Sequence, residues 1–306
     1  MKKTLIASAV AAATLTLSTG VMAAESALAI YGSAEVVYKN VDTGGATTNG
    51  VEDNGSTLGF THSHMISEGV TAFMKAEFHF SADETTAGIN GSDEIYVGVK
   101  GVFGSIQYGV DDTVVEWTDV VDTSEATGLE GEISAVSEIE NIQYVSPEIA
   151  EGVVIGVTLP VESQSDFAGA LAAKYSMDNL EVAFAYAMGR DDSGVAATGA
   201  AEDTISLGGV YTMDEITVMA QYETQADTAD YIGLQGMYTM GQNQFALGYG
   251  MKANDGGTDE STIALQALHN VSDNMYVYAE YTTTSDANNT DGLDEDTLAL
   301  GATYSF

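Results

Sequence analysis

Apolar and polar residues alternate along much of this chain, in segments of about ten residues. The last segment shows the pattern clearly, because Leu298 and Leu300 fall on one face whereas Ala299 and Gly301 fall on the other. Alternation with period two places each set on one side of a β-strand. The same alternation, with Met219 as its one misfit, recurs over residues 180–186, 216–223 and 244–252.

The strands predicted by this pattern have the length and composition of membrane-crossing strands. After residue 23, no uninterrupted apolar run approaches the roughly 18 to 20 residues that a spanning helix needs, whereas about ten residues suffice for a tilted strand. The faces opposite the apolar ones carry Gly, Ala, Thr, Gln and charged residues, which suit water better than a packed core. The sequence therefore predicts an all-β protein, a transmembrane antiparallel β-barrel.

The alternative is a soluble β-sandwich, whose strands also alternate but are usually shorter. Only two prolines, strands of about eleven residues and a chain that ends on Phe306 favour the barrel. We expect sixteen strands, a count that leaves room for an aqueous channel. Their predicted centres are Tyr31, Phe60, Met74, Val97, Ile106, Gln143, Ile155, Ala172, Ala183, Leu207, Val218, Leu234, Leu247, Leu265, Val277 and Leu300.

Short turns are predicted at one end of these strands and longer acidic loops at the other. Residues 176–179, 212–215, 239–242 and 272–274 have the composition of tight hairpins. Residues 191–203 and 254–260 are longer and rich in Gly, Asn and acids. This asymmetry is typical of outer-membrane barrels.

The first 23 residues have the features of an export signal. Lys2 and Lys3 precede an apolar stretch, and Val21-Met22-Ala23 supplies the small residues that a signal peptidase requires. We expect cleavage after Ala23, so that residues 24–306 form the mature barrel domain outside the cytoplasm.

Composition excludes several classes of function. The chain has 46 acidic residues against 8 Lys and Arg, a formal charge of -38, and no cysteine. Binding to nucleic acid phosphates requires cations that are scarce here. Disulfides, thiolate metal sites and cysteine nucleophiles are excluded. No nucleotide-binding motif occurs, so no cofactor is expected.

Several blocks, taken in order, resemble the general Gram-negative porins, a family of trimeric sixteen-stranded diffusion channels. The most specific block is residues 95–104, IYVGVKGVFG, and the terminal Tyr304-Ser305-Phe306 resembles the family's signal for the outer-membrane assembly machinery. The remaining blocks are residues 30–32, 56–60, 68–72 and 141–147. The resemblance implies a homotrimer in the outer membrane of a Gram-negative bacterium, surrounded by lipid, with a third loop that folds into the lumen.

The sequence departs from the family's pattern where arginines usually line the wall opposite that loop. Thr57, Asp93-Glu94 and Gly109-Val110 stand at positions where basic residues are common in the family. Much of the positive wall is therefore expected to be missing.

The third loop, predicted at about residues 110–140, is unusually acidic. Ten acids and no Lys or Arg occur from Asp111 to Glu140. An acidic constriction favours cations over anions, and salt near 1 M erodes that preference. The acids assigned to the constriction are Asp111, Asp112, Glu116, Asp119, Asp122 and Glu125. General acidity of a protein adapted to salt remains the alternative explanation of these charges.

Strand parity places several charged side chains on the pore wall. Lys75, Glu77, Lys100, Lys174 and Lys252 are expected to face the lumen, because a lysine facing lipid near mid-membrane costs roughly 2 to 4 kcal/mol. The sequence thus predicts a general diffusion porin that passes small hydrophilic solutes and prefers cations.

Three other functions stay open: a substrate-specific porin, an outer-membrane barrel enzyme using His79, and an acidic soluble secreted binding protein. The pair His62 and His64 lacks further ligands, so neither a metal site nor a catalytic residue is assigned.

Overall fold

The computed structural model describes residues 28–83, 88–121, 123–129, 138–161, 167–189, 202–286 and 294–306. In these residues, one antiparallel sheet contains every strand. The only helix among the described residues is the short 3₁₀-helix η1 (Val114–Thr118). The strands are β1 (Leu28–Asp42), β2 (Thr47–Asp53), β3 (Thr57–Ser67), β4 (Val70–Phe80), β5 (Ile89–Gly101), β6 (Gly104–Asp112), β7 (Glu138–Val145), β8 (Val153–Pro160), β9 (Phe167–Met177), β10 (Leu180–Gly189), β11 (Thr204–Met213), β12 (Ile216–Gln225), β13 (Ala229–Met240), β14 (Asn243–Asn254), β15 (Glu260–Ser272), β16 (Met275–Asp286) and β17 (Glu295–Ser305).

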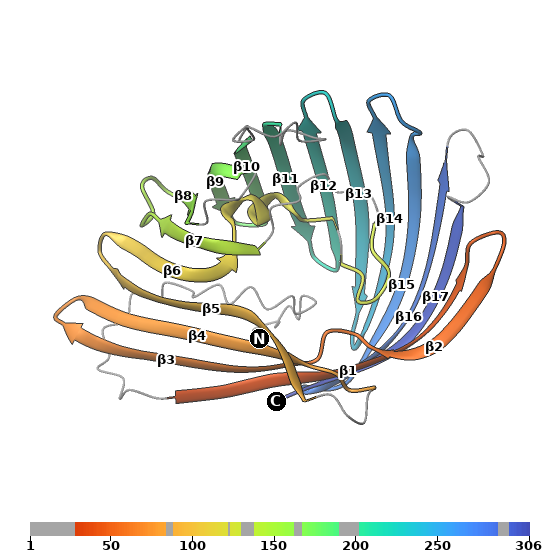
Figure 1. Ribbon diagram of the computed structural model, residues 1–306, viewed down its shortest axis with the longest axis horizontal. Coiled ribbons are helices and arrows are strands. Elements are labelled where there is room, and N and C mark those ends of the chain that lie inside the picture. Colours follow the sequence, from red (N-terminus) through yellow and green to blue (C-terminus); the bar gives the residue numbers. More distant parts are fainter. Residues whose placement is uncertain are drawn as a thin grey trace, which may run out of the picture.

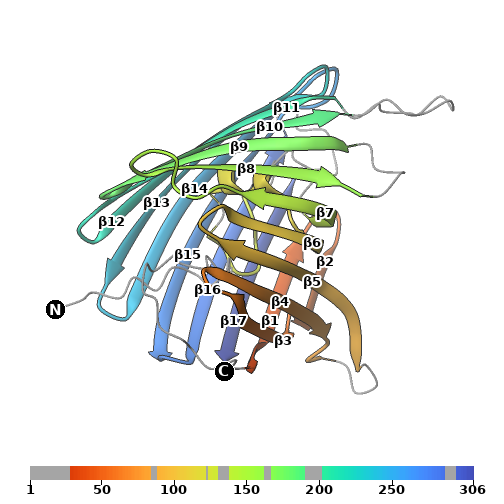
Figure 2. The same cartoon turned by 90° about the vertical axis from the view of Figure 1, so that its left-hand side faces the viewer.

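The sheet closes on itself because β1 pairs with the last strand, β17, from Ser33↔Ser305 to Asp42↔Asp296 (Figures 1 and 2). On its other side β1 pairs with β3 in its first half and with β2 in its second half. These two strands together fill one position, so the barrel has sixteen. The predicted closed barrel of sixteen strands is confirmed, and every predicted centre lies within a strand.

The sequence pattern did not predict β2. Its sequence, TTNGVED, lacks apolar alternation. It extends the hairpin with β1 at the end of the barrel where the long loops lie. At that end, a strand does not lie between lipid and the water of the lumen. Its residues therefore need not alternate between apolar and polar.

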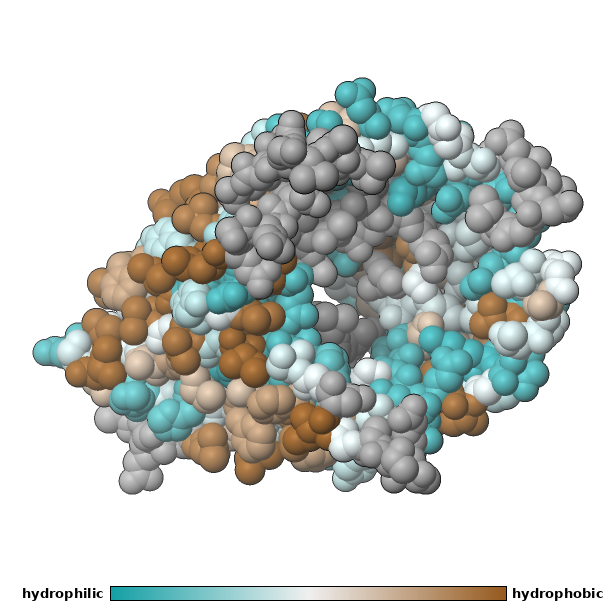
Figure 3. Space-filling model, viewed as in Figure 1, coloured by the Kyte–Doolittle hydropathy of each residue, from teal (hydrophilic) through white to brown (hydrophobic). Residues whose placement is uncertain are grey.

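The two faces of the barrel differ as the alternation predicted. On β17, Leu298 and Leu300 on the outer face are 41% and 49% exposed, whereas Ala299 on the inner face is fully buried. On β12, Val218 is exposed outside and Gln221 and buried polar neighbours lie inside. Figure 3 shows brown, hydrophobic residues gathered along the outer left and lower rim and an opening through the centre. The barrel therefore has an apolar outer surface and a polar interior.

The predicted tight turns all occur at one end of the barrel. Asp178 and Asp214 have φ of 52° and Gly241 has φ of 63°, in the left-handed region that Gly adopts freely and Asp tolerates. Both described chain ends, Leu28 and Phe306, lie at this same end, where Gly32 and Phe306 exchange backbone hydrogen bonds. Within the described residues, no helix is long and apolar enough to cross a membrane.

Candidate pore constriction

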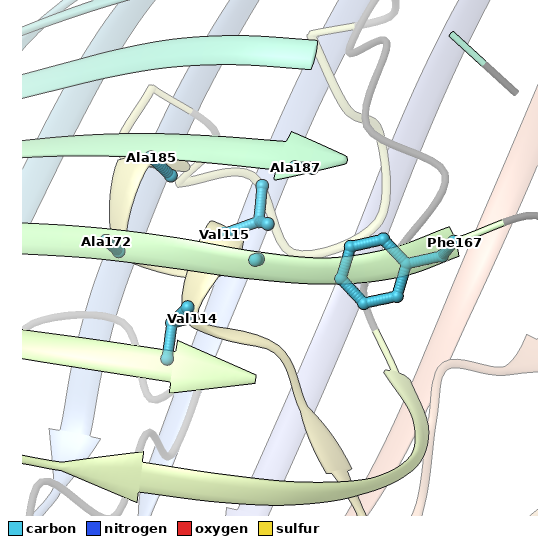
Figure 4. Close-up of a cluster of buried hydrophobic side chains, with 7 residues drawn as sticks. Val114, Val115, Phe167, Ala172, Ala185 and Ala187 are labelled. Carbon is cyan, nitrogen blue, oxygen red and sulfur yellow. The ribbon is translucent and has the colours of Figure 1, made fainter. Parts of the chain in front are cut away.

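The segment that follows β6 crosses the interior of the barrel along its wall. Thr113 caps η1, since its hydroxyl accepts a hydrogen bond from the backbone N–H of Val115. Figure 4 shows Val114 and Val115 packed against Phe167 and small side chains of the wall. The cluster, on β9 and β10, also contains Ala170, Ala172, Ala185 and Ala187. Burial of apolar area, about 25 cal/mol per Å², fixes the start of this segment against the wall.

A row of inward-facing glycines allows the segment to lie close to the wall. A Cβ added at Gly156 would stand closer than 3.0 Å to the Trp117 ring, and one added at Gly248 would meet Leu129. The same overlap would arise between Gly208 and Thr118 and between Gly233 and Val121. Met219, the misfit in the alternation of β12, points inward and joins the apolar cluster that contains Val121 and Leu129.

Wall side chains hold the segment through hydrogen bonds to its backbone. The Val114 N–H donates to Thr158 Oγ1 (3.0 Å), the Val120 N–H donates to Gln221 Oε1 (3.0 Å), and Gln266 Nε2 donates to the Thr123 carbonyl (2.7 Å). Backbone groups that turn toward the wall thus find partners, as buried backbone groups require. The wall and the segment form one hydrogen-bonded layer.

The tip of the segment is held by one carboxylate. Glu280 on β16 is 2% exposed and accepts the backbone N–H groups of Glu125 (2.6 Å), Ala126 (2.9 Å) and Thr127 (3.0 Å). Gln266 Nε2 donates to the same carboxylate at 2.9 Å. Hydrogen bonds to a charged acceptor are worth about 1.5–3 kcal/mol each. Glu280 is therefore the main polar anchor of the tip.

The side chains around the tip complete this contact. Asn54, between β2 and β3, donates to the Glu125 carbonyl (2.7 Å), and the Tyr276 hydroxyl donates to Glu125 Oε2 (2.6 Å). The segment thus runs from β6 to the neighbourhood of β16 and β1. The inner faces of β3–β6 lie across the lumen from this segment.

The predicted loop acids divide into two groups. Asp111 and Asp112 lie at the end of β6, where they pair with Ile139 and Glu138 of β7, so they belong to the wall. The observed connection between strands therefore begins at Thr113, three residues later than predicted.

Glu116, Asp119 and Glu125 lie in the crossing segment itself, whereas Asp122 is outside the described residues. Burial, together with the charges of Asp119, Asp112 and Glu223, raises the pKa of Glu116 to about 8. Burial and Glu223 raise the pKa of Asp119 to about 6. At neutral pH, Glu116 is therefore mostly protonated and Asp119 mostly ionised.

The wall opposite the segment is not a positive surface. Lys75, on the inner face of β4, is 4% exposed and contacts the carboxylate of Glu94, with Glu77 at 3.9 Å. Glu94 and Lys75 also act electrostatically on Asp111 and Asp112. The one lysine at mid-height is therefore balanced by more than one acid, and this wall carries net negative charge.

The remaining wall cations predicted from the sequence do not join Lys75. Lys100 lies next to the turn at the end of β5, with its Nζ 5.7 Å from the centre of the Phe73 ring. Lys252 lies near the other end of the barrel, two positions before the end of β14. Lys174 is paired with Glu181 (3.8 Å) and lies over the Trp117 ring (5.3 Å). Among the residues that the structure describes, these cations are spread along the pore and form no ring.

The histidines occupy two different surfaces. His62 and His64 pair across strands with Met74 and Ala72, so they belong to the outer face, with ring centres 5.5 Å apart. His79 faces Asp93, with its Nε2 3.4 Å from the carboxylate. Among the described residues, no group of three or more His, Cys, Asp or Glu could hold a metal ion.

Sequence reasoning missed the side chains that position the crossing segment. Glu280, Gln266, Gln221 and Asn54 carry no motif. The available signal was strand parity, which places Glu280 on the inner face of β16 beside Thr282, opposite the apolar Val277 and Tyr281. Parity shows that such residues face inward, but it does not show which of them meet the loop.

A closed barrel of sixteen strands, apolar outside and polar inside, with a segment that narrows its interior, defines a channel protein of the outer membrane. Comparisons with known proteins agree. Residues 7–290 match the family model described as Gram-negative porin. The chain therefore belongs to the Gram-negative porin family, and both family and fold place it among channels rather than enzymes.

Two curated relatives are 33% identical over 287 residues, covering 82% of this chain and 77% of theirs: the "Monosaccharide porin" of Halomonas sp and the "Major outer membrane protein" of Halomonas elongata. Among solved structures, Salmonella typhi OmpF, in complex with daunomycin, aligns with a TM-score of 0.77 at 19% identity, over 91% of this chain and 97% of that one. A loop-deletion mutant of Vibrio cholerae OmpT aligns with a TM-score of 0.72 at 18% identity, over 92% and 99%. At these identities, the two solved structures show that the fold is similar.

Proposed function

We propose that this protein is a general diffusion porin whose water-filled channel passes small hydrophilic solutes and prefers cations. The observation that carries the proposal is the docked acidic segment opposite a wall whose mid-height lysine is paired with acids. Negative charge then lies on both sides of the narrowest passage. Charged constrictions of this kind select ions in water-filled pores.

The charges act over the whole cross-section of such a pore. The Debye length is about 10 Å at 0.1 M salt and about 3 Å at 1 M. A permeating ion in a lumen of comparable width feels the field of Asp119 and Glu125 at low salt and much less of it at high salt. The preference for cations is therefore expected to decline as salt increases.

A substrate-specific porin is the second candidate, because one relative is named for monosaccharides. Aromatic rings on the inner wall, such as Tyr31, Phe73 and Tyr96, offer surfaces for a sugar. These rings are largely covered by other wall side chains, and Phe73 and Tyr96 are at most 9% exposed. This burial supports general diffusion over a continuous aromatic track.

The remaining parts of the proposal concern partners and processing. We propose a homotrimer, consistent with the family and with the OmpF-like fold. Phe306 at the end of β17 is the proposed signal for outer-membrane assembly, and residues 1–23 are the proposed export signal. The mature protein is then surrounded by outer-membrane lipid.

Swelling of liposomes that contain the purified protein tests general diffusion. We expect neutral mono- and disaccharides to enter at rates that fall smoothly with size and do not saturate. Saturation by one monosaccharide, with exclusion of others of equal size, would instead support the substrate-specific channel. Absence of swelling with all solutes, in liposomes shown to hold folded protein, would contradict a channel of either kind.

A further inference from the structure

Two aromatic rings of the inner wall share one arrangement with a glycine of the neighbouring strand. Tyr31 on β1 lies directly opposite Gly59 on β3, and Tyr278 on β16 lies directly opposite Gly301 on β17. In each pair, a Cβ added to the glycine would stand closer than 3.0 Å to the ring. The ring therefore lies flat across the neighbouring strand, in the space that a side chain would otherwise fill.

This arrangement complements the one beneath the crossing segment. The inner glycines of β8, β11, β13 and β14 receive side chains or backbone of that segment, whereas Gly59 and Gly301 receive rings from the wall itself. Some inner glycines therefore seat the segment, and others hold bulky rings against the wall.

The Tyr31 ring is also linked to the charges of the wall. Lys75 Nζ lies 6.0 Å from the ring centre and contacts the Glu94 carboxylate. A cation at that distance from an aromatic face is attracted by about 0.5–1 kcal/mol or more. The ring is therefore held between Gly59 on the wall side and the Lys75 ammonium.

We propose that Gly59 is a positioning residue that sets the width of the channel, because its missing side chain lets Tyr31 lie flat beneath Lys75. The proposal rests on the porin function proposed above. A methyl group at residue 59 forces the ring away from the wall, since carbon atoms need about 3.5–4.0 Å between them. The ring then shifts away from the wall toward the lumen, and Lys75 moves with it.

Single-channel conductance of Gly59→Ala tests the proposal. The three atoms nearest the new methyl belong to the Tyr31 side chain and not to backbone, so the barrel can still form. We expect conductance roughly 1.5-fold below the unmodified protein, since a shift of a ring by one or two ångströms reduces the open cross-section. We also expect slower entry of the larger neutral sugars in the swelling assay.

The double variant Tyr31→Ala, Gly59→Ala separates this role from a general effect on the barrel. Removing the ring should restore conductance to the original level or above it, and Tyr31→Ala alone should raise conductance. Gly236→Ala on the outer face of β13, where nothing lies within 4 Å of an added Cβ, is the matched control and should change nothing. If Gly59→Ala does not assemble, the conductance of Tyr31→Ala alone still tests whether the Tyr31 ring narrows the channel.

Unchanged conductance of Gly59→Ala, or a double variant as narrow as the single one, would overturn the role of Gly59. Both results presuppose that the unmodified protein conducts. An unmodified protein without conductance would contradict the proposed porin function itself. The two failures are therefore distinguishable in one set of recordings.

Discussion

Replacing Glu280 with alanine is expected to release the tip of the crossing segment from the wall. The substitution removes the acceptor of three backbone N–H groups and of the Thr127 hydroxyl. Loss of even one hydrogen bond to a charged group, about 1.5–3 kcal/mol, changes the ratio of docked to released tips by roughly ten- to a hundredfold. In single-channel recordings, the open-channel current should become larger on average and much noisier.

Two further variants make this prediction specific. Glu280→Gln keeps one carbonyl acceptor and should produce an intermediate effect. Glu52→Gln removes the same charge from an exposed position on β2 and should leave the current noise unchanged. Quiet, unaltered current through Glu280→Ala would show that the apolar contacts alone hold the segment in place.

The cation preference should increase as pH rises from about 5 to about 9. Glu116 and Asp119 have pKa values raised to about 8 and about 6, so both are neutral at the lower pH and ionised at the higher. A unit charge about 7 Å from an ion in water contributes about 0.6 kcal/mol, or roughly threefold in local ion concentration before screening. The ratio of cation to anion permeability should therefore rise in two steps.

The same shifts predict how docking depends on pH. A carboxyl group whose pKa is raised on folding contributes stability to the docked segment that is fully present below its unfolded pKa. This stability is lost as pH rises through the raised pKa values, about 6 for Asp119 and about 8 for Glu116. Charged groups that face Glu116 include Asp112, Glu223 and Asp119, all of them acidic. Ionisation of Glu116 is therefore opposed from every side by like charge.

Reversal potentials of Glu116→Gln, measured across this pH range, check the assignment. The variant should show a clearly smaller step near pH 8 and keep the step near pH 6. Asp214→Asn is the control, since it removes an exposed carboxylate in the tight turn between β11 and β12. A step near pH 8 of unchanged size in Glu116→Gln would assign that titration to another group.

The sequence predicted the barrel because each membrane strand must satisfy lipid on one face and water on the other. That constraint appears directly as alternation, which is why all sixteen centres lie in strands. This constraint does not act on β2, which extends beyond the barrel wall, so alternation does not predict that strand. Parity also predicts that Lys75 and Glu77 lie on the inner face of β4, where both are buried.

The constriction could be predicted only in part. Its position between β6 and β7 and its acidity are properties of consecutive residues, so they can be read from the chain. Its anchors come from strands far away in sequence: Glu280 contacts Glu125 across 155 positions. The pairing of Lys75 with Glu94 likewise depends on the register between β4 and β5, which no local pattern specifies.

The reversal potential of the purified protein in a planar bilayer, with 0.1 M KCl on one side and 1 M on the other, tests the central claim most directly. An open, water-filled lumen with acids on both sides of its narrowest passage predicts the cation-selective sign, and a weaker preference when both salt concentrations are raised. A reversal potential of the anion-selective sign, or one that salt does not alter, would contradict the account.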